Sequence, residues 1–69
     1  MRIIFQNSRG QKRVIEEDTP SDETAFDKIN SFCEERGFKI SYVRCWEGED
    51  GKSTIVDVGS WTELFILER

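Results

Sequence analysis

The sequence contains no histidine, one proline and only two cysteines. Without histidine it lacks the commonest general base and metal ligand, and no Ser-His or Cys-His nucleophile pair can form. Cys33 and Cys45 are too few for the disulfide framework of a small secreted domain, and their spacing does not match a zinc motif. We therefore expect free thiols in a reducing cytosol, no metal, no cofactor and no catalytic residue, and we predict that the protein is not an enzyme.

Long apolar runs are also missing. No stretch approaches the roughly 20 apolar residues of a membrane span, and the apolar run within residues 1–7 is too short for the core of a signal peptide. The acidic segment 47–52 lacks the glycine register and the length of a calcium-binding EF-hand loop. We expect a cytoplasmic protein without membrane contact, in which residues 47–52 form a solvated hairpin turn.

Charge of one sign dominates, with 14 Asp and Glu against 10 Lys and Arg and a net charge of −4. This balance disfavours broad binding to nucleic acid or to an anionic membrane surface, because both need cations to neutralise phosphates. It is compatible with solubility alone or with a basic protein partner. A sharper hypothesis is that the acidic clusters imitate a row of phosphates and inhibit a nucleic-acid-binding protein.

The segment 21–36 is predicted to be an amphipathic helix. Thr19 or Ser21 can cap its first amides, Pro20 suits its start, and Gly37 suits a left-handed residue at its end. Apolar residues recur at spacings of three and four and form one stripe that includes a packed core thiol: Ala25, Phe26, Ile29, Phe32 and Cys33.

Segments rich in β-branched and aromatic residues predict five strands: 2–6, 11–17, 38–46, 53–58 and 63–68. Gly10 provides the turn of the first hairpin, and the alternation blurs past Tyr42, where a bulge is an option. Residues 1–69 thus predict a single small α+β domain of order ββαβββ, with one helix on a mostly antiparallel five-stranded sheet. The strand orders 2-1-3-4-5 and 2-1-5-4-3 both keep every neighbouring pair antiparallel, and both remain open.

Apolar residues fall on both faces of this predicted sheet. One set is expected to face the helix: Ile3, Phe5, Ile40 and Val56. Alternation along each strand then turns a second set away: Ile4, Val43, Cys45 and Ile55. Either Leu64 with Ile66 or Phe65 with Leu67 must also face away. An uncovered apolar patch of this kind marks an interface.

Four residues are the candidate partner-binding side chains: Tyr42, Arg44, Trp46 and Trp61. Tryptophan is enriched at binding hot spots, and Trp61 lies in a Gly-Ser-Trp-Thr turn where exposure is costly. The competing interpretation is that Trp61 folds back over a small core, while Tyr42 and Trp46 close the edge of that core.

These features predict a protein-binding or regulatory module that acts through an apolar sheet face and its tryptophans, with a protein partner or a second copy of itself. Alternative hypotheses are a structural homodimer joined through the open face, a single-stranded nucleic-acid binder that stacks bases on Tyr42, Arg44 and Trp46, and the acidic nucleic-acid mimic. Net charge makes nucleic acid the less favoured partner.

Overall fold

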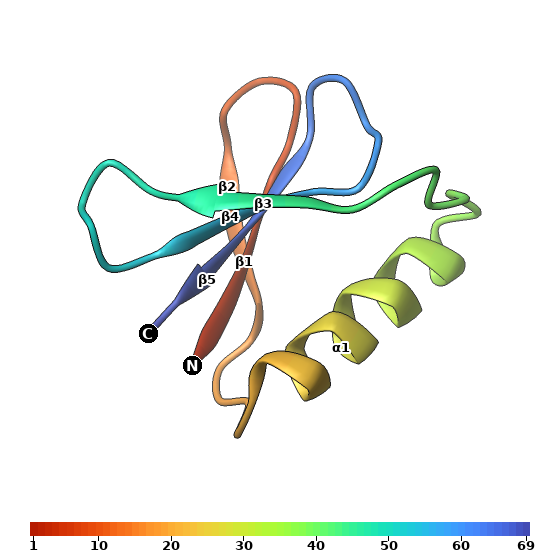
Figure 1. Ribbon diagram of the computed structural model, residues 1–69. Coiled ribbons are helices and arrows are strands. Elements are labelled where there is room, and N and C mark those ends of the chain that lie inside the picture. The colour runs from red at the N-terminus through yellow and green to blue at the C-terminus, as the bar shows by residue number, and fades with distance from the viewer.

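The computed structural model describes residues 1–69 and contains one helix and five strands (Figure 1). In chain order they are β1 (Arg2–Gln6), β2 (Lys12–Glu16), α1 (Asp22–Glu35), β3 (Arg44–Glu47), β4 (Thr54–Asp57) and β5 (Leu64–Glu68). The strands form one sheet of order β2-β1-β5-β4-β3, in which every neighbouring pair is antiparallel. The predicted fold class is confirmed, and the strand order is the second of the two that the sequence left open.

The last strand, β5, lies at the centre of the sheet. It pairs with β1 on one side and with β4 on the other. Both chain termini therefore lie at the same end of the sheet, where Arg2 pairs with Glu68 (Figure 1). This arrangement builds the sheet from segments distant in sequence, so its centre forms only when the C-terminal residues reach the first strand.

The helix α1 begins and ends where local chemistry predicts. Ser21 has an extended backbone at φ −154°, and its hydroxyl accepts a hydrogen bond of 3.2 Å from the Thr24 amide. Asp22 and Glu23 occupy the first turn, where negative charge is favourable beside the positive end of the helix dipole. Gly37 follows the helix at φ +71°, a backbone conformation open to glycine at little cost.

The core lies between α1 and one face of the sheet. The helix contributes Ala25, Ile29 and Cys33, the sheet contributes Ile3, Phe5, Val56, Phe65 and Leu67, and Val58 follows directly after β4. The rings of Phe5, Phe32 and Phe65 lie 5.0–5.7 Å apart, centroid to centroid, in tilted or edge-to-face arrangements that aromatic pairs favour. Burial of Cys33 confirms the predicted core thiol.

The predicted strand 38–46 is wrong over most of its length, because only Arg44–Glu47 forms β3. Residues 38–43 connect the end of α1 to the far edge of the sheet, and Figure 1 shows this connection as a long green segment. No strand runs beside them, and a single backbone bond of 3.3 Å joins Ser41 to Val58. Phe38 and Ile40 still pack against the core, which explains why their spacing resembles that of a strand.

The other strands match their predicted bounds to within one residue. The register irregularity lies between Ile3 and Ile4, where β1 pairs with β2, and not past Tyr42 as considered from the sequence. The predicted bulge is misplaced because Tyr42 precedes β3 and has no ladder to interrupt.

Candidate protein-binding face of the sheet

A row of apolar residues, one from each strand, crosses the face of the sheet turned away from α1. Directly paired residues share a face of an antiparallel sheet, and the register joins these five in sequence across it. This apolar row consists of Val14, Ile4, Ile66, Ile55 and Trp46. Ile4 and Ile55 therefore point away from the helix, as predicted, and Ile66 rather than Phe65 shares that face.

Cys45 was expected on this face, and that expectation is wrong. It pairs with the core residue Val56, so it lies on the helix side of the sheet. The error follows from the strand assigned to 38–46. The prediction assumed that side chains alternate between the two faces from Ile40 onward, but residues 38–43 are not a strand, and the alternation within β3 is offset from that assumption by one residue. Cys45 is nonetheless exposed, because β3 forms the outer edge of the sheet. Val43 precedes β3 and is 50% exposed, so the open face does not include it as a strand residue.

All four predicted partner-binding residues line one hollow of about 390 Å³ at the β3 end of this face. Tyr42 comes from the connection into β3, Arg44 and Trp46 come from β3 itself, and Trp61 comes from the turn before β5. The remaining lining residues are Asp57, Ser60, Thr62 and Leu64. We call this the aromatic hollow. Tyrosine, tryptophan and arginine are the residue types enriched at protein interfaces, and their role in binding remains a prediction.

Trp61 is 99% exposed and contacts almost nothing in its own chain. It follows Gly59, whose φ of +95° lets the chain turn out of β4. The interpretation in which Trp61 folds back over the core is therefore wrong. The core is already closed on the helix side by α1, so nothing in the fold draws this ring inward.

The Arg44 side chain is fixed by Asp57, its partner across β3 and β4. A guanidinium nitrogen of Arg44 donates to the Asp57 carboxylate at 2.8 Å, and the Gly59 amide donates to the other carboxylate oxygen at 3.0 Å. The hydrogen bond from Arg44 is the main cause that lowers the pKa of Asp57, with the Gly59 amide next. The same hydrogen bond raises the pKa of Arg44.

Arg44 also lies against an aromatic ring, with its guanidinium carbon 5.3 Å from the centre of the Tyr42 ring. Asp57 is nearly buried, whereas 65% of the Arg44 side chain remains exposed. The pair therefore holds the cation and Tyr42 in place while leaving both accessible at the rim of the aromatic hollow.

A second hollow of about 520 Å³ lies on the same face, over the middle of the apolar row. Trp46 and Leu64 line both hollows, so the two adjoin. Sequence reasoning missed Leu64, Asp57, Ser60 and Thr62 as members of this surface. Alternation within 63–68 offered Leu64 as one of two choices, but the other three become neighbours of Tyr42 only through the pairing of β3 with β4.

The acidic segment 47–52 forms a tight turn, as predicted. One carboxylate oxygen of Asp50 accepts hydrogen bonds from the Lys52 amide, the Ser53 amide and the Ser53 hydroxyl at 2.8–2.9 Å. These bonds, led by that from the Ser53 amide, lower the pKa of Asp50 to about 2. The structure contains no group of three or more Cys, Asp or Glu placed to hold a metal ion.

The single helix has neither the length nor the apolar content that a membrane crossing requires. No protein-family model, curated protein or solved structure matches this chain. Fold and site together define a small α+β domain with an open, partly apolar sheet face, and the functional argument rests on that face.

Proposed function

We propose that this chain is a non-enzymatic binding module whose open sheet face docks on a protein partner. The observation that carries the proposal is the 99% exposure of Trp61 at the rim of the aromatic hollow. An exposed tryptophan adds almost nothing to folding, whereas its full burial against a partner removes a large apolar area from water. Tryptophan side chains of this kind dominate the binding energy of many interfaces.

Three further features of the hollow support this proposal. Trp46 is 44% exposed and Tyr42 is 48% exposed, so both rings present area to a partner. Arg44 is held in position by Asp57 at 2.8 Å, so little side-chain entropy is lost when it is covered. The apolar row extends the surface across all five strands.

Affinity capture with the full chain tests the proposal. Wild type, Trp61→Ala and Lys39→Ala are immobilised at equal density and exposed to lysate from the native host, and bound proteins are quantified. Lys39 is exposed and lies outside the aromatic hollow, so its truncation is the matched control. We expect a partner that wild type and Lys39→Ala retain and that Trp61→Ala loses by about tenfold or more, the usual scale of a hot-spot residue. Equal capture by all three variants would contradict a tryptophan-centred interface.

A second candidate is a homodimer joined through the same face, and the apolar row favours it. Two copies placed face to face would cover Val14 and Trp46, which are 37% and 44% exposed in the single chain. Sedimentation equilibrium of wild type and Trp46→Ala separates the candidates, because the dimer predicts self-association that Trp46→Ala weakens. A protein that stays monomeric at all accessible concentrations would exclude the homodimer.

Single-stranded nucleic acid gains less support from the geometry. Arg44 is the one cation that lines the aromatic hollow, and Asp57 already accepts its hydrogen bond. A phosphate backbone would have to compete with that carboxylate. Titration of single-stranded RNA at low salt, followed by the fluorescence of Trp46 and Trp61, checks this alternative directly.

A further inference from the structure

Cations gather at the N-terminal hairpin although the chain as a whole is acidic. Residues 1–15 contain Arg2, Arg9, Lys12 and Arg13 and no carboxylate side chain, whereas all 14 Asp and Glu follow from Glu16 onward. Of these four cations, only Arg2 has a carboxylate within 4.0 Å. Three unpaired positive charges on one hairpin of a protein rich in carboxylates create a local positive potential.

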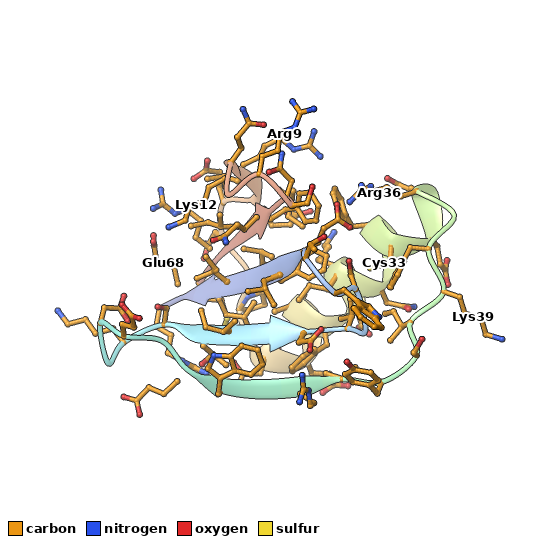
Figure 2. All side chains as sticks on the ribbon, turned by 90° about the horizontal axis from the view of Figure 1, so that it is seen from above. Arg9, Lys12, Cys33, Arg36, Lys39 and Glu68 are labelled. Carbon is orange, nitrogen blue, oxygen red and sulfur yellow. The ribbon has the colours of Figure 1, made fainter.

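A hollow of about 590 Å³ lies between this hairpin and the C-terminal end of α1. Figure 2 shows Arg9 near the tip of the hairpin, with Lys12 and Arg36 to either side of it. The lining residues are Phe5, Asn7, Gln11, Lys12, Arg13, Phe32 and Arg36, and none of them is acidic. We call this the basic hollow. It lies on the helix side of the first hairpin and shares only Lys12 with the open face.

Two guanidinium groups in the basic hollow are held in place by aromatic rings. The Arg13 carbon lies 5.5 Å from the centre of the Phe32 ring, and the Arg36 carbon lies 5.5 Å from the same ring and 4.7 Å from Phe5. Stacking on a ring fixes a guanidinium group and leaves its in-plane N–H donors free. Arg36 gives one donor to Glu63 at 3.2 Å, whereas Arg13 has no carboxylate partner.

We propose that the basic hollow binds the phosphate group of a small phosphate monoester. Arg13 and Arg36 direct two guanidinium groups into it, and the one charge of Glu63 leaves a net charge of about +1, while the register turns the Lys12 side chain toward the open face. A guanidinium group pairs with phosphate oxygens through two parallel N–H donors. Arg13 lies on β2 and Arg36 follows the end of α1, so their N–H donors reach the hollow from two different elements. Donors that do not lie in one plane suit a tetrahedral phosphate better than a planar carboxylate. The C-terminal end of α1 contributes roughly half a negative charge, which reduces this field without reversing it.

The probes are inorganic phosphate, glycerol phosphate and a nucleoside monophosphate, with acetate as the carboxylate, all at equal ionic strength. Binding to the full chain is followed by shifts of backbone amide resonances. We expect saturable shifts confined to residues 5–13 and 32–37 for the phosphates, and weaker, unsaturated shifts for acetate. Whichever phosphate binds most tightly identifies the source of the group.

Matched variants test the residues. Arg13→Gln is expected to weaken phosphate binding about tenfold or more, the usual scale of a charge-assisted hydrogen bond. Lys52→Gln removes the same charge from the turn between β3 and β4 and should leave binding within about twofold. Arg36→Gln provides a second variant in the basic hollow should Arg13→Gln prove unfolded.

The proposal is overturned if acetate and phosphate shift the same resonances equally, if the shifts do not saturate, or if Lys52→Gln loses as much affinity as Arg13→Gln. It stands independently of the proposed protein-binding function, because Trp61 does not line the basic hollow. Trp61→Ala should bind phosphate as wild type does, so failure of one proposal leaves the other intact.

Discussion

Replacement of Trp61 and of Trp46 by alanine should affect folding to very different degrees. Trp61 is 99% exposed and Trp46 is 44% exposed, although both line the aromatic hollow. The same chemical change at the two positions therefore separates a side chain that the fold uses from one that it does not. No other pair of residues in the chain offers so close a match.

The exposed fractions set the magnitudes. A fully covered tryptophan side chain buries about 200 Å² and contributes about 25 cal/mol for each Å². At 99% exposure Trp61 contributes less than about 0.1 kcal/mol, whereas Trp46 at 44% exposure contributes about 3 kcal/mol as an upper estimate. A domain of 69 residues has a free energy of unfolding of about 3–10 kcal/mol, so Trp46→Ala should remove a large part of it.

Urea unfolding followed by far-ultraviolet circular dichroism measures both variants without relying on tryptophan emission. We expect Trp61→Ala to unfold within about 0.5 kcal/mol of wild type, as surface substitutions do, and Trp46→Ala to lose about 2–3 kcal/mol. Quenching of Trp61 emission in a Trp46→Phe background gives an independent measure of exposure. A loss above about 1 kcal/mol in Trp61→Ala, or protection of Trp61 from quencher in the monomer, would refute the reasoning.

Three further predictions concern single side chains. Ser21→Ala should cost about 1 kcal/mol in thermal unfolding, because the 3.2 Å bond from the Thr24 amide is lost, and Ser21→Gly should cost only a few tenths. The lowered pKa of Asp50 means that the contacts of its carboxylate are complete above its ordinary value of 3.8 and are lost as pH falls through about 2; a carbon NMR titration of the carboxyl checks that midpoint. Iodoacetamide should label Cys45 in the native protein and reach Cys33 only in denaturant, since burial raises the pKa of Cys33 and covers its thiol; equal native labelling by mass spectrometry would contradict this.

Elements governed by local chemistry could be predicted closely from the sequence. The bounds of α1 follow from a cap at Ser21 and a left-handed Gly37, both of which act within one turn of the helix. The first hairpin follows in the same manner from the turn at Gly10, which has φ +79°. These signals need no information about the rest of the chain.

Elements that depend on a distant partner could not be predicted. Residues 38–42 alternate apolar and polar as a strand does, yet no strand runs beside them, and alternation alone does not encode a neighbour. The central place of β5 likewise depends on its pairing with β1, about 60 residues away.

The candidate site was predicted in composition but not in structure. Tyr42, Arg44, Trp46 and Trp61 were selected by residue type, and the fold brings them to one hollow. The exposure of Trp61 could not be predicted, because it depends on whether α1 closes the core without it. Sequence composition likewise pointed to no anion site. The net charge of −4 is a sum over the whole chain, and it does not reveal that every charged side chain in residues 1–15 is positive.

Exposure along the apolar row indicates where a partner would gain most. Inside the row, Ile4 is only 8% exposed although no helix covers that face, and Ile66 and Ile55 are partly buried. Val14 and Trp46 lie at the two ends and are 37% and 44% exposed. The middle of the row therefore already stabilises the isolated sheet, and covering it would add little. A partner gains most at the end that holds Trp46, where the row meets Trp61 and Arg44, so the binding energy should be concentrated over β3, β4 and the turn before β5.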